Sequence, residues 1–406
     1  MPDYDVLICG AGAGGLSLAH FLSRQGRRVL VVDKQSRPRD QHKGELLQPR
    51  SVQLLSAAGL IEPLTRQGSR TVNRLVCRTA HDAELVDLDF GLLDGPFNYG
   101  LLHFYRDFRE VLGAELAADY RQGTKVEGLL RSSDGRVTGA RLACGTEVSA
   151  ALTVACDGPR SRLRAGIPSS QRRYGHQLAA FELTGVPELG TDMTMYLTSA
   201  GLRLLFGMPG GRARLYVQLP VNRFRDIGRA GLADWITTLL REVPALSKVE
   251  SPLRANMHSV QVLPAWRASV SAWQVPGMVL LGDAAHTVHP VVGQGMNAAI
   301  GDAWSLASIL STVDVLTPGA VDSVAARYEA ERRPVMAYVA RLSHVLARLF
   351  TTTSAVATLV RPHLLRHNRD NAALRRRIVH NMAGFGSDPF TAWAVMSAVR
   401  GRSASY

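Results

Sequence analysis

A glycine turn directly after an apolar strand is the feature that most constrains this chain. Residues 4–9 (YDVLIC) are an apolar run of strand length, residues 10–15 (GAGAGG) follow at once, and residues 16–26 then carry a helical pattern. This order is typical of dinucleotide-binding folds. One glycine allows the tight turn, the next lets a pyrophosphate approach the backbone, and the last lets helix and strand pack closely. We therefore predict cofactor contacts at Gly10, Gly12, Ala13, Gly14 and Gly15.

An acidic residue ends the next predicted strand. Residues 28–32 (RVLVV) run into Asp33, which lies 18 residues after Gly15. A carboxylate at this place accepts hydrogen bonds from the hydroxyls of an adenosine ribose and disfavours a 2′-phosphate. NAD and FAD share this ADP half, so the motif does not separate them. An unrelated α/β protein with a glycine turn is the alternative.

Two further strand ends carry an acid beside a glycine. Residues 154–156 lead into Asp157-Gly158, and residues 278–281 lead into Gly282-Asp283. The order of these motifs, with the stretch GDAAHTVHPVVGQGMN at 282–297, resembles the single-component FAD-dependent monooxygenases of the para-hydroxybenzoate hydroxylase type. The resemblance covers about residues 4–340, including the stretches HFYRDFR at 103–109 and YEAERRP at 328–334.

The resemblance implies an FAD site assembled from all these motifs. The glycine turn and Asp33 would hold the ADP part, Arg106 would lie near the ribose and pyrophosphate, and Asp157 and Asp283 would lie near the pyrophosphate and ribityl chain. The turn that begins at Pro290 would pass the isoalloxazine ring, where backbone N–H groups and a helix N-terminus suit the negative charge of reduced flavin. The other residues assigned to FAD in this way are Lys34, His42, Lys43, Gly44, Gly158, Gly282, Gly293, Gln294, Gly295, Met296 and Asn297.

One segment departs from the family pattern. Many members have an arginine shortly before the glycine that matches Gly44, whereas this chain has His42 and Lys43 there. Which side chain would bind the mobile flavin ring is therefore an open question. Residues 44–49 (GELLQP) also resemble squalene epoxidases, which widens the substrate range from phenols to isoprenoid compounds. A solvated position is the alternative interpretation of Glu45 and Arg50.

Alternating apolar and polar residues predict a second sheet between the motifs. Strand patterns occur at 178–184, 193–197, 202–208 and 213–219, with Gly- and Pro-containing turns between them. We predict an α/β fold in which a Rossmann-like FAD-binding domain (1–75, 99–170 and 266–315) is interleaved with a mostly antiparallel β-sheet substrate domain (76–98 and 171–265), followed by a C-terminal helical region (316–406). Candidate pocket residues on the sheet are Phe206, Tyr216 and His258, for each of which an ordinary core or surface position is the alternative.

The two histidines of the 282–297 stretch suggest a metal site at first sight. His286 and His289 are three residues apart, and imidazole is a common metal ligand. The sequence shows no cluster of acids or cysteines that completes such a site, so we predict no metal. We expect His286 to have a structural role, whereas His289, beside Pro290, is a candidate for substrate or flavin-ring contact.

Charge and hydropathy restrict the partners. The net charge is +13, but the chain has only four lysines and its arginines are spread throughout, which argues against a nucleic-acid-binding stripe. No apolar run approaches the length of a spanning helix, so we expect a cytoplasmic protein. Apolar residues at helical spacing in 336–349 predict a helix packed on the core, with peripheral membrane contact of the C-terminal helices as the alternative.

Together with these motifs, the resemblance implies an FAD-dependent monooxygenase. NADH or NADPH would reduce FAD, O2 would add to give a C4a-hydroperoxyflavin, and one oxygen atom would pass to an aromatic or isoprenoid-bearing small molecule, as in secondary metabolism. Hydroxylation and epoxidation both remain open, and no catalytic side chain is required because the flavin carries the chemistry. A reductase of isoprenoid double bonds, a flavin-dependent halogenase and a non-catalytic binding module are the alternatives.

Overall fold

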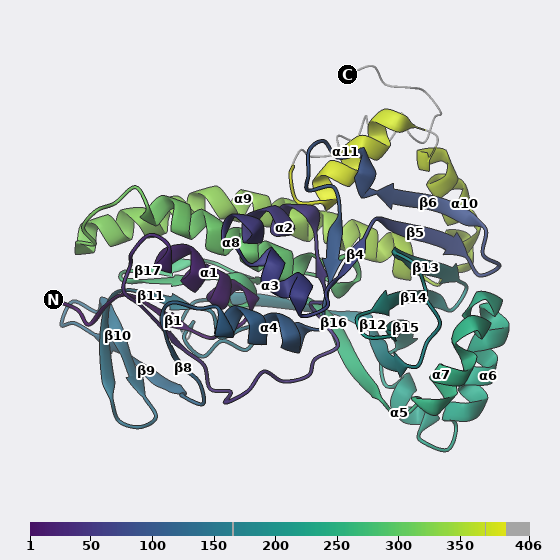
Figure 1. The fold of residues 1–406 in the computed structure, drawn as a ribbon, viewed down its shortest axis with the longest axis horizontal. Helices are drawn as coiled ribbons and strands as arrows, with labels where there is room; N and C mark the ends of the chain where they lie inside the picture. Colours follow the sequence, from purple (N-terminus) through teal and green to yellow (C-terminus); the bar gives the residue numbers. More distant parts are fainter. Residues whose placement is uncertain (165, 370, 387–406) are drawn as a thin grey trace.

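A largely parallel sheet forms the first half of the molecule (Figure 1). The computed structural model describes residues 1–164, 166–369 and 371–386. The strand order is β17-β18-β11-β1-β2-β8, with β10 and β9 added antiparallel beside β11. The strands are β1 (Tyr4–Cys9), β2 (Val29–Val32), β8 (Asp119–Arg121), β9 (Val126–Arg131), β10 (Val137–Leu142), β11 (Glu147–Ala155), β17 (Gln274–Val275) and β18 (Met278–Leu280). The central strands are buried apolar runs, as expected where helices cover both faces.

Helices from distant parts of the sequence pack on this sheet. Helix α1 (Ala13–Ser23) lies beside α8 (Gln294–Leu310), and α8 in turn packs against α9 (Pro318–Thr351). The others near this half are α2 (Pro49–Ala57), α3 (Ile61–Arg66) and α4 (Tyr105–Ala114). Gly14 lets α1 lie close to the end of β18, because a Cβ on Gly14 would lie 2.5 Å from Cδ2 of Leu281.

A second, mostly antiparallel sheet forms the other half, and we call it the substrate sheet after the role predicted for it from the sequence. Its order is β19-β16-β12-β15-β14-β13-β5-β6, in which only the β13–β5 pair is parallel among the described strands. Its members are β5 (Arg74–Thr79), β6 (Glu84–Asp89), β12 (Ser169–Thr184), β13 (Asp192–Thr198), β14 (Gly201–Met208), β15 (Arg212–Pro220), β16 (Val260–Val270) and β19 (His286–Thr287). The four strands predicted between residues 178 and 219 are confirmed.

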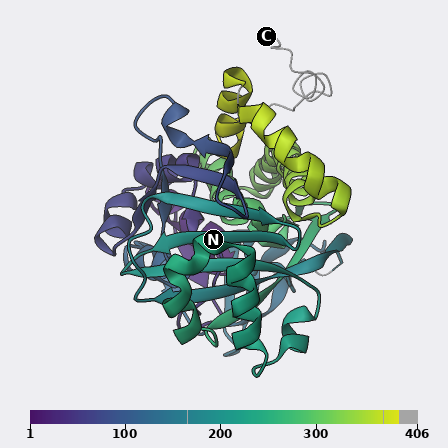
Figure 2. The ribbon, with the colours of Figure 1, turned by 90° about the vertical axis from the view of Figure 1, so that its right-hand side faces the viewer.

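Three helices cover the outer face of the substrate sheet. Figure 2 shows α5 (Arg223–Ile227), α6 (Leu232–Glu242) and α7 (Glu250–Ala255) in front of its strands. Alternate residues of β15, including Leu215 and Val217, are buried under them with Ile236 and Leu253. The opposite face of the sheet is therefore turned toward the first half of the molecule.

The remaining elements are a small sheet, the last two described helices and short 3-10 turns. A small sheet consists of β3 (Leu46–Leu47), β7 (Gly100–Leu102) and β4 (Arg70–Val72), and α10 (Ala355–Arg369) and α11 (Ala372–Met382) follow α9. The short 3-10 turns are η1 (Phe90–Leu92), η2 (Pro244–Val249), η3 (Gly282–Ala284) and η4 (Pro290–Val292). The predicted fold class is thus confirmed, with a Rossmann-like sheet, an interleaved second sheet and C-terminal helices.

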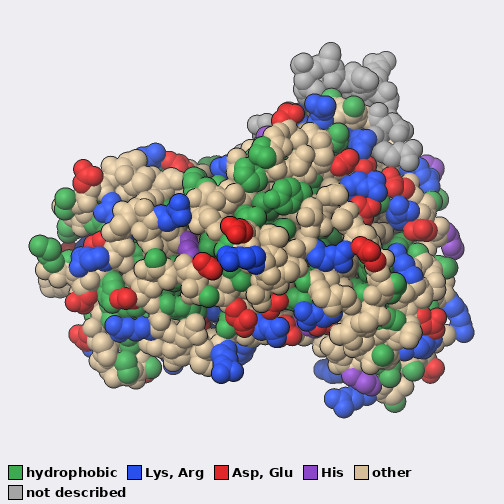
Figure 3. All heavy atoms as spheres, viewed as in Figure 1, with side chains coloured by type: hydrophobic (Ala, Val, Ile, Leu, Met, Phe, Trp, Pro, Cys, Tyr) green, Lys and Arg blue, Asp and Glu red, His purple; other side chains and the backbone are tan. Residues whose placement is uncertain are grey.

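Two surface properties bear on the expected partners. None of the helices in the described part of the chain combines the length and apolar character needed to cross a membrane. On the face drawn in Figure 3, basic and acidic side chains are interspersed. Such mixing is typical of an ordinary solvated surface.

Candidate functional site

The predicted cofactor motifs meet at one edge of the parallel sheet. Register pairs Cys9 with both Val32 and Ala155, and Ala155 with Leu280, so β2, β1, β11 and β18 end side by side. The next residues along the chain supply Asp33, Gly10, Asp157 and Asp283 respectively. Ligands of open α/β sheets bind at this carboxyl edge. The sequence motifs therefore form one site, although they are separated by up to 273 residues (Gly10 to Asp283).

The glycine turn has the geometry that a pyrophosphate requires. Gly10 has a φ of +117°, and a Cβ on it would lie 2.3 Å from the Cys156 carbonyl oxygen. A Cβ on Gly15 would lie 2.0 Å from the carbonyl oxygen of Gly10, so helix and strand are in direct contact there. Gly12 is different, because the nearest atom to its Cβ position is Tyr105 Oη at 3.5 Å. Open space thus remains at the glycine expected to face the phosphates.

Asp33 is held in place by the turn itself. Its Oδ2 accepts hydrogen bonds from the Ala11 N–H at 2.7 Å and from Arg109 Nη2 at 3.1 Å, and its Oδ1 accepts from the Gln35 N–H at 2.7 Å. Arg109 is buried and also donates from Nε to the Ala11 carbonyl at 2.6 Å. The arginine that contacts the acid predicted to bind the ribose is therefore Arg109, which the motif comparison did not single out.

Arg106 and Lys34 lie at the rim of this site. The Arg106 side chain is 41% exposed and pairs with Asp107 at 3.2 Å, and Lys34 is exposed. Arg106 and Arg109 stand three residues apart on α4, and the burial of Arg109 against Asp33 distinguishes them. The sequence shows that the two arginines are three residues apart on a predicted helix. It does not show which of them lies on the face of that helix that contacts Asp33.

The second motif has a free buried acceptor. Asp157 Oδ2 accepts from the Arg162 N–H at 2.8 Å, whereas Oδ1 is buried and has no hydrogen-bond partner among the described residues. Gly158 beside it has a φ of +86° and no atom within 4 Å of its Cβ position. A buried acceptor without a partner is costly. It fits a hydroxyl donor of a bound nucleotide.

Asp283, like Asp33 and Asp157, is partly buried. Burial raises the pKa of Asp283, and the nearby Lys43 and His286 oppose that rise. The preceding Gly282 has a φ of +63°, and a Cβ on Gly295 would lie 4.0 Å from Asp283 Oδ1. The acid therefore faces the start of α8, as a ribityl ligand beside a ring-binding turn would.

Two long helices begin at this edge without side-chain caps. Helix α1 starts after Gly12 and α8 after Gly293, and neither has a side chain that accepts from its first turn. Uncapped N-termini present free N–H groups and a positive dipole end, which suits phosphates and reduced flavin. Together with the open positions at Gly12 and Gly158, the residues present fit FAD.

The turn before α8 is tied to neighbouring segments. Pro290 is exposed, Gly293 is left-handed with a φ of +61°, and Gln294 Nε2 donates to the Met382 carbonyl at 3.0 Å. Asn297 Nδ2 donates to the Leu46 carbonyl at 2.9 Å, and its Oδ1 accepts from the Gln48 N–H at 2.8 Å. The turn predicted to face the flavin ring is thus linked to the segment around Gly44.

That segment is anchored on the substrate sheet. Glu45 is 4% exposed and accepts from Arg214 Nη2 at 2.6 Å and from Tyr216 Oη at 2.8 Å. Burial raises the pKa of Glu45, whereas Arg214 and Tyr216 favour its ionised form. The alternative of a solvated Glu45 is wrong, because its partners lie on a strand about 170 residues away that no local pattern reveals. A Cβ on Gly44 would lie 3.0 Å from Tyr105 Cδ2 and 3.6 Å from Met296 Sδ.

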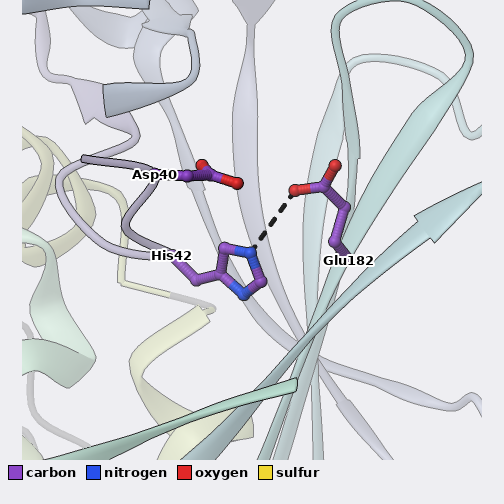
Figure 4. Close-up of side chains that lie close together, drawn as sticks. All are labelled: Asp40, His42 and Glu182. Atoms are coloured by element: carbon purple, nitrogen blue, oxygen red, sulfur yellow. Dashed lines mark ion pairs between the residues drawn. The ribbon is translucent and has the colours of Figure 1, made fainter. Parts of the chain in front are cut away.

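Three acidic or histidine side chains converge beside this segment (Figure 4). The potential ligand atoms of Asp40, His42 and Glu182 lie within 4.8 Å of one another, and His42 Nε2 is 3.4 Å from Glu182 Oε2. Arg212 and Arg214 also contact the Glu182 carboxylate at 3.4 and 3.2 Å. His42 and these arginines lower the pKa of Glu182 to about 2. Two guanidinium groups oppose a bound cation, so we interpret the group as an ion-pair cluster.

The two histidines of the 282–297 stretch have hydrogen-bonded neighbours. His286 Nε2 donates to Asp302 at 2.6 Å, which is a structural role. His289 is 1% exposed, and its Nδ1 accepts from the Val291 N–H at 3.1 Å. Nε2 of His289 lies 2.9 Å from Nε2 of His176 on β12. Both ring nitrogens of His289 are thus engaged within the protein.

The candidate pocket residues separate into two groups. Phe206 and Tyr216 stack with ring centroids 6.0 Å apart on the inward part of the substrate sheet, next to the cluster that contains Leu46 and Phe104. His258 is exposed in the turn between α7 and β16, and its neighbour Met257 packs with the outer helices. The structure therefore places His258 on the surface beside the outer helices and not among the residues that follow the parallel strands.

Comparisons with known proteins agree with this geometry. A family model described as "FAD binding domain" matches residues 3–343. The chain is 30% identical over 373 residues to 6-methylpretetramide 4-monooxygenase of Streptomyces rimosus, covering 88% of this chain and 87% of that protein. It is 26% identical over 364 residues to squalene epoxidase 2 of Arabidopsis thaliana, covering 86% of this chain and 61% of that protein. The crystal structure of PqsL from P. aeruginosa in complex with 2-aminobenzoylacetate superposes with a TM-score of 0.78 at 26% identity, covering 88% of this chain and 99% of that one.

Proposed function

We propose that this chain, which belongs to the FAD-dependent monooxygenase family, uses NADH or NADPH and O2 to hydroxylate or epoxidise an aromatic or isoprenoid-bearing small molecule of secondary metabolism. The observation that carries the proposal is the convergence of Gly10, Asp33, Asp157 and Asp283 at one sheet edge, beside two uncapped helix N-termini. Bound there, FAD would supply the redox chemistry and the activation of O2.

The chain's own residues would bind, orient and shield the reactants. The glycine turn and Asp33 would hold the ADP end, Asp157 and Asp283 the middle, and the turn from Pro290 to Asn297 the ring. Lys34, which follows Asp33, and Lys43, which is near Asp283, would add positive charge for the pyrophosphate, and Arg106 would do the same from α4. Since the flavin carries the chemistry, a catalytic acid or base is not part of the proposal.

Apolar side chains support a large hydrophobic substrate. Tyr216 packs with a cluster that contains Leu178, Leu263 and Val291, together with Leu349 and Phe350 of α9. Val291 directly follows the proline that is expected at the flavin ring. An aromatic or isoprenoid compound placed between this turn and the sheet would find apolar walls, and water excluded from such a site disfavours loss of hydrogen peroxide.

The experiment is oxygen and coenzyme consumption over a panel of substrates. Purified protein loaded with FAD would be mixed with NADH or NADPH and with phenols, quinolones, indoles or polyprenyl compounds, and products would be identified by mass. A substrate of this enzyme should give a product that contains one atom from ¹⁸O2. Incorporation of label from water instead would exclude direct oxygen transfer.

The same experiment separates the alternatives. A reductase of isoprenoid double bonds would consume coenzyme without O2 and yield a product heavier by two hydrogens. A halogenase would require a halide, and the nearest sequence match to its tryptophan motif, Trp273, is 3% exposed and packs on His286 and Tyr328. A non-catalytic binding module would show no turnover with any compound.

We also propose peripheral membrane contact through the C-terminal helices. Val345, Val356, Leu359 and Val360 are 56%, 74%, 72% and 42% exposed, and residues 333–369 contain arginines but no Asp or Glu. Apolar and basic groups together favour an anionic lipid surface. Co-sedimentation with phosphatidylglycerol vesicles tests this, since the Val356→Asp, Leu359→Asp variant should lose binding. Equal sedimentation of variant and parent would contradict it.

A further inference from the structure

The inward face of β15 carries a row of polar side chains that reach out of the substrate sheet. Arg212, Arg214, Tyr216 and Gln218 alternate with the apolar residues buried under α6 and α7. Arg212 lies over the Phe104 ring at 3.8 Å, and Gln218 Nε2 donates to the Thr351 carbonyl at 2.7 Å. Arg214 and Tyr216 both reach Glu45. Strand β15 thus contacts Glu45 and Phe104 of the predicted FAD-binding half through Arg212, Arg214 and Tyr216, and it contacts α9 through Gln218.

The centre of this row is a completely buried charge pair. Arg214 is 0% exposed, and its Nε and Nη2 donate to Glu45 at 3.0 and 2.6 Å. Burying two charges costs free energy, and apolar replacements of such pairs are often neutral or stabilising. Stability alone therefore does not account for the pair. Nη1 of Arg214 is also buried and has no hydrogen-bond partner among the described residues.

Further contacts tie residues 40–47, which we call the 40–47 segment, to the same sheet. Tyr216 Oη lies 2.9 Å from the His42 carbonyl, and His42 Nδ1 lies 3.1 Å from the Ala180 carbonyl. Gln261 on β16 accepts from the His42 N–H at 3.1 Å and donates to the Asp40 carbonyl at 3.2 Å. The segment is therefore held by β12, β15 and β16 together.

The 40–47 segment also borders the predicted flavin position. Gly44 lies between Tyr105 and Met296, and Lys43 is close enough to Asp283 to influence its pKa. Asn297 binds the Leu46 carbonyl from the first turn of α8. A change in how the segment sits on the sheet would consequently displace groups that touch the ring end of FAD.

We propose that Arg214 and Glu45 are positioning residues, which hold the 40–47 segment on the substrate sheet and thereby set the place of the flavin ring relative to the substrate. The proposal rests on FAD being the cofactor. The proposal also accounts for the absence of an arginine just before Gly44, where this chain has His42 and Lys43. The segment would be held instead by Arg214 of the substrate sheet.

The test compares FAD-loaded variants without any substrate. Arg214→Met should leave the dissociation constant of FAD within about threefold of the parent, because the ADP end is held by the glycine turn, which is a separate set of contacts. The rate constant for anaerobic flavin reduction at saturating NADH or NADPH should fall at least about tenfold, since small misplacements of reacting groups are costly. The fluorescence of bound FAD should change in the same variant. Tyr216→Phe, which removes one hydrogen bond, should shift both readouts less.

Two further variants separate positioning from folding. Arg203→Met breaks another buried pair of the same sheet, Arg203 with Glu242 at 2.8 Å on α6, and should lower stability without changing either flavin readout. The double variant Glu45→Leu, Arg214→Met removes both charges, so it should recover stability while flavin reduction stays slow. It also keeps the test usable where Arg214→Met alone does not fold.

The outcomes are distinct. Parental reduction rates and fluorescence in a folded Arg214→Met or double variant would overturn the positioning proposal, as would equal changes in Arg203→Met. A parent protein that takes up no FAD would instead overturn the proposed function, before any variant is compared.

Discussion

His286 donates a hydrogen bond of 2.6 Å from Nε2 to Oδ2 of Asp302, in the interior between η3 and α8. Asp302 also accepts from Arg332 Nε at 2.8 Å and from the Gly282 N–H at 3.2 Å. Burial would raise the pKa of Asp302, but His286 and Arg332 lower it. This acid is thus ionised and fixes the turn that presents Asp283.

The first prediction concerns stability. Asp302→Asn leaves the partly buried guanidinium of Arg332 and the buried imidazole of His286 without their fully buried carboxylate, so the free energy of unfolding should fall by about 3–5 kcal/mol. Urea denaturation of the FAD-free protein measures it. Asp322→Asn is the control, since Asp322 is 42% exposed in its pair with Arg136 and should cost about 1 kcal/mol or less. Equal losses in the two variants would contradict the structural role of Asp302.

The second prediction separates Asp283 from Asp302. Asp283→Ala removes a partly buried carboxylate whose pKa is raised by burial, so the unfolding free energy should not fall as it does for Asp302→Asn. FAD should bind about 10- to 100-fold more weakly, as expected for a lost hydrogen bond to a charged group. Fluorescence titration with FAD measures the affinity. A variant that holds FAD as tightly as the parent would remove Asp283 from the site.

The third prediction tests the two glycine roles. Gly15→Ala places a Cβ 2.0 Å from the Gly10 carbonyl oxygen and should lower the unfolding free energy by at least about 2 kcal/mol. Gly12→Ala meets only Tyr105 Oη at 3.5 Å, so the apoprotein should stay as stable as the parent. Its FAD affinity should nevertheless fall at least about tenfold, a loss of 1.4 kcal/mol. Thermal unfolding and FAD titration of both variants measure these effects. A destabilised Gly12→Ala variant, or one that keeps the FAD affinity of the parent, would contradict the role assigned to Gly12.

The fourth prediction is a dependence of stability on pH. Burial, with His176 and His344, lowers the pKa of His289 from 6.5 to about 3. The unfolded chain therefore takes up the proton first, and the contribution of His289, which is fully present above pH 6.5, is lost as the pH falls toward 3. By pH 3.5 the loss should reach about 4 kcal/mol.

The control for this dependence is His289→Gln, which has no titrating ring. Its unfolding free energy should fall less steeply than that of the parent between pH 6.5 and 3.5, as measured by urea denaturation at each pH. Parallel curves for the two proteins would mean that His289 does not titrate in this way.

The sequence predicted those parts of the site that are local to strand ends. Asp33 and Asp157 directly follow short apolar runs and Asp283 follows one after a single glycine, and neighbouring parallel strands end at the same edge. Their convergence could therefore be predicted without coordinates. The same holds for the alternation of β15, whose apolar face contacts the outer helices.

Contacts between distant segments could not be predicted in this way. Glu45 and Arg214 are 169 residues apart and belong to different halves of the fold, so no periodicity connects them. Whether Arg106 or Arg109 contacts Asp33 depends on which face of α4 lies toward the glycine turn, and the sequence does not reveal this. His258 lies exposed in the turn between α7 and β16, and the alternating pattern does not reveal where α7 ends and β16 begins.

The most direct measurement is the visible absorption spectrum of the purified protein after incubation with excess FAD and removal of free cofactor. The convergence of the four strand ends predicts flavin bands that stay with the protein at one FAD per chain and that bleach when NADH or NADPH is added without oxygen. Protein that emerges without flavin absorbance, however much FAD was supplied, would contradict the account.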